Sequence, residues 1–525
     1  MEEALSLREH LSAAFSRSEN RLGEITGFLG GQEALRMEHG ELERKLGQLG
    51  LGLMCQLLQD HLDLRGPGEV AGEVRDRDGT LRPHARHQFR HLESVFGTVC
   101  VGRMGYGAPG VESLHPMDAA LNLTSDRYSM GVRHRVAAGA AMGSFGETLE
   151  QIEQTTGAHV PKRQAEELAV RASEDFEGFY EDRRRKALEK EPEGKILVLS
   201  FDGKGVAMRK EDLREATRKA AEASKHKLKT RLSKGEKRNF KRMAEVGTIY
   251  TVEPYPRTPE DIIQELSGED ARPEAPRSKR PKPENKRVMA SLARTMEEVI
   301  AEIFDDACHR DPNRVRKWVA LVDGNPSQIL LILKEARRRK VWVQVIVDFI
   351  HVTEYVWKAG TAFHPSGTKE LEAWVQGRLL RILNGESSQV AAGMARSATL
   401  QKLKPEEREQ VDKSAKYLRK LRLHLGYKYY LKDGLPIASG VIEGACRHLV
   451  KDRMEVTGAR WSLKGAEAVL RLRALKSSGD FDEYWLFHER QEKRRNHESR
   501  YKGGAIPEVT LPKPARPRPR FRVVK

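Results

Sequence analysis

Three acidic residues lie in segments whose pattern suits metal-dependent phosphoryl transfer: Asp202, Asp323 and Glu443. Asp202 and Asp323 each follow a run of apolar, mostly β-branched residues, which predicts a buried strand that ends in a glycine-containing turn. Glu443 lies in a Gly-Val-Ile-Glu-Gly segment that leads into a helical pattern over residues 441–450. Two strand-end aspartates and a helix glutamate predict a shared magnesium site.

The chemistry that this trio could perform is cleavage or joining of a phosphodiester. Two magnesium ions about 3.5 to 4 Å apart stabilise the attacking and leaving oxygens, and Mg²⁺ prefers carboxylate ligands. In this hypothesis Asp202 bridges both ions, Asp323 holds one and Glu443 the other, and the nucleophile is water or a DNA 3′-hydroxyl. Taken singly, each residue has a simpler explanation, because Asp-Gly is a common turn dipeptide and the chain has 76 acidic residues.

The elements around these residues predict an α/β multidomain protein. A strand over 319–322, a turn, a helix to residue 340, a strand over 341–347 and another helix alternate as βαβα, which predicts parallel strands. Apolar residues at helical spacing from 371 to about 430 predict an all-α insertion. An aromatic group then precedes a basic, proline-rich tail: Phe481, Tyr484, Trp485 and Phe487.

The first third of the chain predicts a mainly helical DNA-binding region. Residues 5–64 have helical periodicity, and a strand is expected over 94–101. Helices over 146–154 and 162–170, with a break between them, resemble a helix-turn-helix whose recognition helix begins with Lys162, Arg163 and Gln164. An ordinary helical hairpin explains the same pattern equally well.

Composition favours a nucleic-acid partner. The chain has 525 residues and a formal net charge of +17, and a basic, helical stretch over 209–242 is expected to contact phosphates. Residues 254–283 are rich in proline and charge, which predicts a flexible loop. The four cysteines form no Cys-x-x-Cys pair, and neither a signal peptide nor a membrane span is apparent, so we expect a reduced cytoplasmic protein that contacts no membrane.

Several motifs together resemble bacterial insertion-sequence transposases of the ISKra family, which are DDE-type enzymes related to Mutator-like elements. The resemblance extends from about residue 96 to about residue 475. It is carried by five segments: Phe-Asp-Gly-Lys-Gly-Val at 201–206, Val-Asp-Gly at 322–324, Asp-Phe-Ile-His at 348–351, Gly-Val-Ile-Glu-Gly at 440–444 and Thr-Gly-Ala-Arg-Trp-Ser at 457–462.

The resemblance implies roles for particular residues. Asp202, Asp323 and Glu443 become the catalytic and metal-binding acidic residues, and Asp348 and His351 match a supporting Asp-x-x-His signature. For His351 a structural role is the favoured interpretation, and Trp461 could stack on a base or be buried against the sheet. The residues expected to contact DNA are Lys162, Arg163, Gln164, Lys204, Lys227, Lys229, Arg231, Arg447, Lys451, Arg460 and Trp461.

The same resemblance implies an activity and its partners. We expect Mg²⁺-dependent cleavage and strand transfer, with Mn²⁺ able to substitute, on double-stranded terminal inverted repeats and target DNA. Pairing two ends implies a homodimer or higher oligomer in the bacterial cytoplasm, associated with the nucleoid when bound to DNA. Related enzymes often carry a zinc ribbon before the first aspartate, but residues 106–110 contain no cysteine, so no structural zinc is predicted.

The expected organisation has five parts. It comprises an N-terminal helical region (1–90), a DNA-binding region with a small β element and the helix-turn-helix-like segment (91–190), a ribonuclease H-like core (191–358 and 436–478) with a basic insertion (208–244) and a flexible loop (254–287), an all-α insertion (359–435), and a basic, partly disordered tail (479–525). Two alternatives remain open: a ribonuclease H-like nuclease or resolvase without strand transfer, and a non-catalytic DNA-binding protein descended from a transposase.

Overall fold

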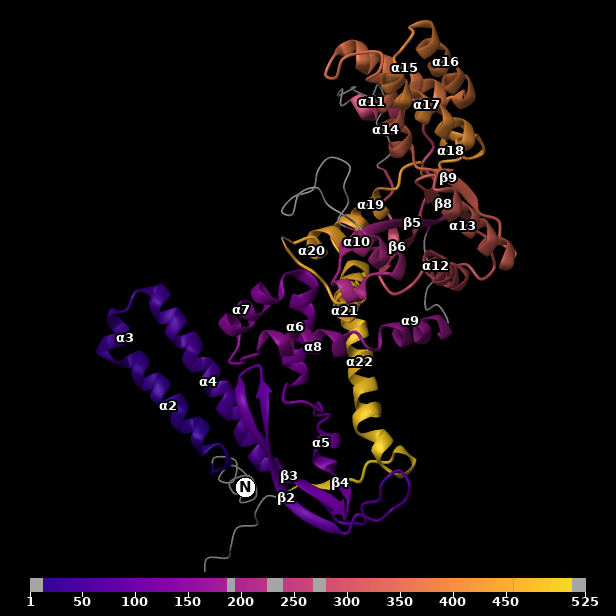
Figure 1. The fold of residues 1–525 in the computed structure, drawn as a ribbon. Coiled ribbons are helices and arrows are strands. Elements are labelled where there is room, and N and C mark those ends of the chain that lie inside the picture. Colours follow the sequence, from indigo (N-terminus) through magenta and orange to yellow (C-terminus); the bar gives the residue numbers. More distant parts are fainter. Residues whose placement is uncertain (1–12, 187–193, 224–238, 268–279, 457, 512–525) are drawn as a thin grey trace, which may run out of the picture. The chain divides into compact units, whose positions relative to one another are not determined.

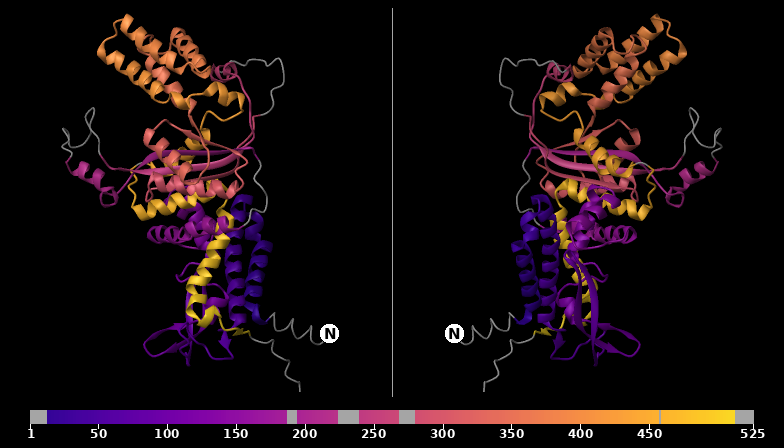
Figure 2. Two further views of the ribbon diagram at one scale, coloured as in Figure 1. Left: turned by 90° about the vertical axis from the view of Figure 1, so that its right-hand side faces the viewer. Right: turned by 90° about the vertical axis from the view of Figure 1, so that its left-hand side faces the viewer.

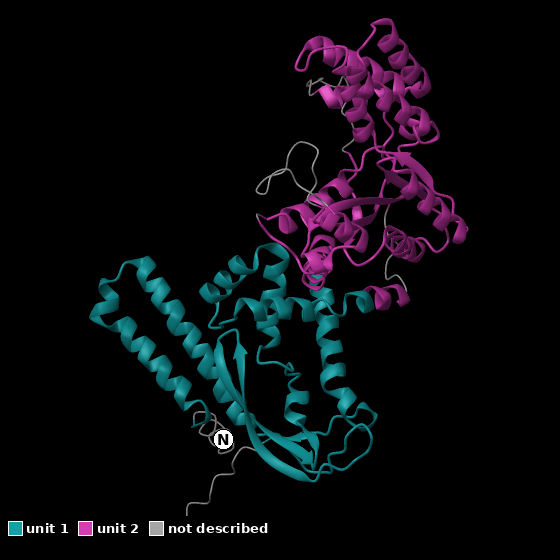
Figure 3. Ribbon diagram, viewed as in Figure 1, with its two compact units in different colours: residues 1–179, 481–525 teal, residues 180–480 magenta. Residues whose placement is uncertain are grey.

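The protein is a mixed α/β chain with two compact units. The structure, a computed structural model, describes residues 13–186, 194–223, 239–267, 280–456 and 458–511 (Figure 1). Unit 1 comprises residues 1–179 and 481–525, and unit 2 comprises residues 180–480 (Figure 3). Within the described part of the chain, every helix is too short or too polar to cross a membrane.

Unit 1 begins with the predicted helices. They are α2 (Ser16–Gly30), α3 (Gln32–Arg36) and α4 (His39–Arg65). The buried carboxylate of Asp60 on α4 accepts hydrogen bonds from the backbone N–H and the hydroxyl of Ser18, at 3.1 and 2.6 Å. Because a buried charge needs such partners, this contact fixes α2 against α4.

The β element of unit 1 is an antiparallel sheet of β2 (His84–Ser94), β3 (Gly97–Ala108) and β4 (Val111–Leu114). The strand predicted over 94–101 overlaps β3 from Gly97 on, but its predicted start is wrong, because the hairpin turn falls at Val95 and Phe96, with Ser94 paired to Gly97. Gly97 has φ +132°, a conformation that side chains disfavour, so this glycine permits the tight turn.

The helix-turn-helix-like segment consists of two of the helices that follow the short α5 (Pro116–Ala120). These two helices are α7 (Phe145–Thr155) and α8 (Lys162–Ala172), which lie where helices over 146–154 and 162–170 were predicted. Helix α6 (Met130–Met142) packs against both of them. A capping box of Ser144 and Glu147 starts α7, and Pro161 precedes α8. A side chain on Gly157, between them, would come within 2.3 Å of the Phe96 carbonyl oxygen, so only glycine allows this approach.

The chain returns to unit 1 after residue 480. Helix α22 (Phe481–Asn496) buries its four aromatic side chains, and β10 (Val509–Thr510) pairs with β1 (Glu69–Val70). The expected partly disordered tail therefore includes ordered elements up to residue 511, since burial of the aromatic rings stabilises α22. Residues 512–525 lie outside the described residues.

Unit 2 is built on a five-stranded sheet in the order β7-β6-β5-β8-β9. The strands are β5 (Ile196–Ala207), β6 (Lys241–Val252), β7 (Glu284–Ser291), β8 (Lys317–Val322) and β9 (Gln344–Val347). Strand β6 is antiparallel to β5 and β7, whereas β5, β8 and β9 are mutually parallel, as the βαβα pattern predicted for β8 and β9.

Helices connect these strands. They are α10 (Glu215–Ala223), α11 (Pro259–Ser267), α12 (Met296–Arg310), α13 (Pro326–Arg338) and α14 (Phe349–Gly360), and α9 (Phe176–Arg185) spans the boundary between the units. Helix α11 and the start of β7 lie in the predicted loop over 254–287. Thr258 and Asp261 exchange hydrogen bonds that cap α11, and Ile262 is buried, which explains why a helix forms there.

The expected all-α insertion consists of α15 (Lys369–Leu383), α16 (Ser387–Leu400), α17 (Pro405–Lys420) and α18 (Tyr427–Lys432), and Figure 2 shows α15 to α17 gathered in one block. Their apolar side chains join the same hydrophobic core as the sheet. The chain continues through α19 (Gly440–Ala445), a π-helical segment (Cys446–Lys451), α20 (Asp452–Met454) and α21 (Leu463–Ser478), which packs against β7.

Candidate functional site

Asp202 lies within β5 and not in a turn after it. Strand β5 pairs with β6 from Ile196 to Ala207, but with β8 only from Ile196 to Ser200. The predicted end of the strand is therefore wrong, because the pairing with β6 continues past Asp202 and past the two glycines that come after it, Gly203 and Gly205. Asp202 is half-buried, at a position where β8 has already ended.

Asp323 directly follows β8. Since Ser200 is paired with Leu321 in the parallel register, Asp202 and Asp323 both lie two residues further along neighbouring strands. The side-chain carboxylate of Asp323 accepts a hydrogen bond from the backbone N–H of Asn325 at 2.8 Å. The backbone carbonyl oxygen of Asp323 accepts one from the Tyr417 hydroxyl at 2.9 Å. These bonds fix the turn into α13 and connect it to α17.

Gly324 allows this turn to form. It has φ +93°, and a side chain there would meet Leu421 Cδ1 at 2.5 Å. Glycine is therefore needed after Asp323, because a side chain at position 324 would collide with Leu421 of the all-α insertion.

Glu443 extends from α19, close to Asp348 and His351. Among the described residues, these three side chains form the one group whose ligand atoms all lie within 4.8 Å of one another and could hold a metal ion. Partial burial and the Asp348 carboxylate raise the pKa of Glu443, and the charge of Asp202 acts in the same direction. The trio of Asp202, Asp323 and Glu443 does not form such a close group, although Asp202 and Glu443 interact electrostatically.

Asp348 caps α14 directly after β9 and is 1% exposed. One oxygen accepts the Ile350 N–H at 2.7 Å, and the other accepts the Ser439 N–H at 3.0 Å and the Ser439 hydroxyl. Because Ser439 immediately precedes α19, the buried Asp348 carboxylate determines where that helix begins. The supporting role predicted for Asp348 in the site stays a prediction.

A π-helical segment directly follows α19. Its hydrogen bonds run from residue i to i+5, so each turn holds more residues than an α-helical turn. Arg473 on α21 donates from Nε to the Leu449 carbonyl oxygen at 2.9 Å and from a second nitrogen to the His448 carbonyl oxygen. This guanidinium therefore holds the helix that follows Glu443.

Cys446, the first residue of the π-helical segment, contacts Asp202. Its buried thiol lies 3.1 Å from Asp202 Oδ2, while Oδ1 accepts the Gly203 N–H at 2.6 Å. Burial, followed by the charge of Asp202, raises the pKa of the Cys446 thiol. The contact connects β5 to the segment that carries Glu443. Sequence reasoning missed Cys446, although its position three residues after Glu443 places both on neighbouring turns of a helix.

The residues present fit a hard divalent cation. Asp202, Asp323 and Glu443 offer carboxylate oxygens, which Mg²⁺ prefers, and neither aspartate is fully exposed. His351 fits Mg²⁺ less well, because imidazole suits transition metals better. The oxygens of Asp348 already accept hydrogen bonds from Ile350 and Ser439. Of the three carboxylates chosen from the sequence, only Glu443 belongs to the close group with Asp348 and His351, so metal binding by Asp202 and Asp323 stays a prediction.

Several basic residues lie near Glu455 in unit 2. The pKa of Glu455 is lowered, mainly by a 2.9 Å hydrogen bond from Lys241. The positive charges of Lys204 and Lys451 lower it further. Arg447 and Arg460 are exposed. Such cations can contact phosphates, and Lys241 belongs to the basic stretch over 209–242 for which the sequence predicts such contacts.

The other predicted DNA contacts have different positions. Lys162 and Arg163 are exposed on the first turn of α8 in unit 1, and Gln164 is half-buried. Trp461 is half-buried, its backbone pairs with the end of β5, and its indole N–H donates to the Met454 carbonyl oxygen at 3.2 Å. Lys227, Lys229 and Arg231 lie outside the described residues.

No family model matches the chain, and no curated protein is significantly similar to it.

Proposed function

We propose that this protein is a DDE-type transposase that cleaves and joins DNA at the ends of a bacterial insertion sequence. The proposal depends on one observation: Asp202 on β5 and Asp323 after β8 occupy equivalent positions in the register of two neighbouring parallel strands. Glu443 is close enough to Asp202 for the charge of Asp202 to raise its pKa. The mixed sheet, with antiparallel β6 and β7 on one side of β5 and parallel strands on the other, supports a ribonuclease H-like core. The motifs named above support the family.

Each group has a defined part in this proposal. The carboxylates of Asp202, Asp323 and Glu443 would hold Mg²⁺, which would activate the attacking oxygen and stabilise the leaving one. Asp348 positions α19 through Ser439, and Arg473 holds the segment after it. Lys204, Arg447 and Lys451 contact DNA phosphates near the cut, and Lys162 and Arg163 on α8 contact the terminal repeats. Two copies of the chain pair the two DNA ends.

The test uses DNA from the boundaries of the element that encodes the protein. Full-length wild type and the variants Asp202→Asn and Glu443→Gln are incubated with labelled end DNA, a target plasmid and Mg²⁺. We expect wild type to nick the end and join it to the plasmid, and each variant to lose about 10³-fold or more of this activity, as expected when charge stabilisation of the transition state is removed. Binding of end DNA should be retained.

A matched control is Glu370→Gln, which neutralises an exposed carboxylate on α15 and should retain full activity. Undiminished nicking by Asp202→Asn would overturn the assignment of the site. Nicking without joint products would indicate a nuclease or resolvase, and binding without nicking would indicate a non-catalytic DNA-binding protein.

A further inference from the structure

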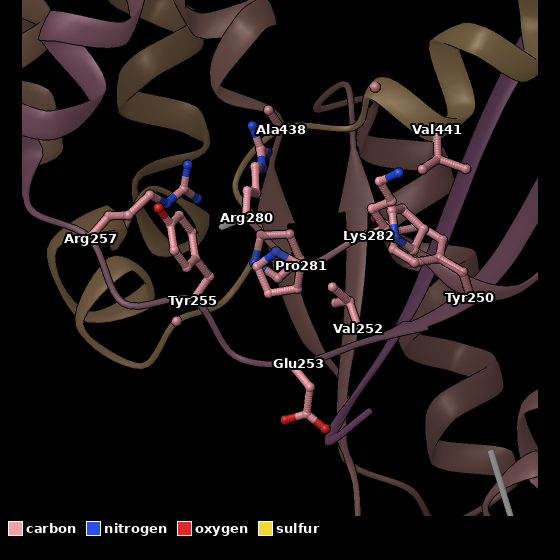
Figure 4. A pocket seen from close by; sticks show the side chains of 14 residues that line it. Tyr250, Val252, Glu253, Tyr255, Arg257, Arg280, Pro281, Lys282, Ala438 and Val441 are labelled. Carbon is pink, nitrogen blue, oxygen red and sulfur yellow. The ribbon is translucent and has the colours of Figure 1, made fainter. Parts of the chain in front are cut away.

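Unit 2 contains a pocket of about 350 Å³ next to the segment that leads into α19 (Figure 4). Three chain segments line it: the end of β6 with the loop after it (250–257), the residues before β7 (280–283), and the residues between α18 and α19 together with the start of α19 (434–441). These segments are far apart in the sequence, so no local pattern marks the pocket.

The pocket has an excess of positive charge. Arg257, Arg280 and Lys282 line it together with a single carboxylate, Glu253. The Glu265 carboxylate lies 3.8 Å from a guanidinium nitrogen of Arg257, a distance too long for a hydrogen bond. A pocket with three cations and one anion favours an anionic ligand.

Arg257, which lines this pocket, has a buried and unsatisfied donor. Its side chain is 8% exposed, and in the described part of the chain no group accepts a hydrogen bond from its buried Nε. Burial, followed by the charge of Arg280, lowers the pKa of Arg257. An anion bound near these two arginines would offset the repulsion between their charges.

The pocket also offers apolar faces. Tyr255 and Pro281 line it, and the Arg257 guanidinium carbon lies 5.7 Å from the centre of the Tyr255 ring. Aromatic rings of this kind stack on nucleic-acid bases. The volume is at the lower end of the range of about 300–1,000 Å³ typical of small-ligand pockets, so it suits one nucleotide unit and not a duplex.

The pocket is next to the candidate site. Gly440 and Val441 line it, and Glu443 follows on the same short helix. Tyr250, which also lines the pocket, is close enough to both Arg280 and Asp348 for their charges to act on its hydroxyl. A ligand held in the pocket is therefore near the start of α19.

We propose that this pocket binds a single nucleotide unit, with the phosphate held by Arg257, Arg280 and Lys282 and the base or sugar against Tyr255 and Pro281. The assignment of a DNA strand as the source rests on the proposed function, because such a strand would pass beside Glu443. A free nucleotide offers the same chemistry, and the experiment distinguishes the two sources.

The experiment is calorimetric titration of the full-length protein, in EDTA to prevent cleavage, with dAMP, deoxyadenosine, inorganic phosphate and a 5′-phosphorylated trideoxynucleotide. Loss of two charge-assisted contacts in Arg280→Ala/Lys282→Ala should weaken binding of the phosphate-bearing probes by about tenfold or more. Tyr255→Ala should weaken binding of the nucleotides more than that of phosphate. Arg280 and Lys282 are both exposed, so the double variant should fold. Its thermal melting temperature checks this.

The matched control is Arg396→Ala/Lys428→Ala, which removes two exposed cations from α16 and α18 and should bind every probe as wild type does. Tighter binding of the trinucleotide than of dAMP by wild type assigns a DNA strand as the occupant, and binding of dAMP that is as tight or tighter assigns a free nucleotide. Unchanged binding by the 280/282 variant, or no binding of any probe by wild type, overturns the proposal. Nicking by wild type, assayed separately, shows whether the proposed function fails independently of the pocket.

Discussion

At the scale of single residues, the contact between Cys446 and Asp202 joins two parts of the site that are 244 residues apart in the sequence. Acidic residues can be chosen from a sequence because their chemistry and the strand patterns before them are visible there. The thiol of Cys446 has no such signal, since its partner is defined only by the fold. Asp202 was thus predictable as a candidate, whereas its hydrogen-bond partner was not.

The protonation of Cys446 is testable. Burial and the neighbouring carboxylate raise the pKa of its thiol, and only the thiolate reacts with alkylating agents. At pH 8 we expect iodoacetamide to leave Cys446 unmodified in the native protein, measured by mass spectrometry of peptides. Cys100 and Cys308 are half-buried and should react faster. Guanidinium unfolding should make all cysteines react alike, and alkylation of native Cys446 at the rate of Cys100 would contradict this prediction.

At the scale of elements, strands and helices were predictable where their apolar pattern is local. The runs before Asp202 and Asp323 correctly indicated β5 and β8, but the full length of β5 depends on pairing with β6, which no local pattern shows. The same limit applies to the π-helical segment. It was predicted as a regular helix, and its carbonyl groups are held by Arg473, which comes more than 20 residues later.

Arg473 is therefore expected to act as a positioning residue. Arg473→Met leaves the Leu449 and His448 carbonyl oxygens without its two donors, so unfolding free energy should fall by about 1–3 kcal/mol. Because the segment follows Glu443, nicking of end DNA should fall at temperatures where the variant is still fully folded, as circular dichroism can establish. Lys464→Met, an exposed position on the same helix with the same change in charge, should leave both quantities unchanged. A variant that loses stability but nicks normally would limit Arg473 to a structural role.

At the scale of the whole molecule, the order of segments along the chain was largely predictable, but the composition of unit 1 was not. Helical and strand patterns indicated an α/β protein with an all-α insertion, and the structure contains these parts. The return of residues 481–511 to unit 1 depends on what the aromatic residues contact. Tyr484 donates to the Ala172 carbonyl oxygen at 2.6 Å, and Glu492 pairs with the buried Arg133 at 2.7 Å. Partners more than 300 positions away are not visible in local sequence.

This arrangement predicts that a chain ending at Asp480 loses the fold of unit 1. The truncation removes four buried aromatic side chains, each contributing about 1.5–3 kcal/mol, and so about 6–12 kcal/mol in total, comparable with the whole stability of about 5–15 kcal/mol of a typical domain. It also leaves the buried Arg133 without Glu492. Calorimetry should therefore show the loss of one unfolding transition and retention of the transition of unit 2, whose core lies within residues 180–480. A chain ending at residue 511 keeps α22 and β10 and should retain both transitions, whereas two intact transitions after truncation at 480 would show that unit 1 folds without its C-terminal helix.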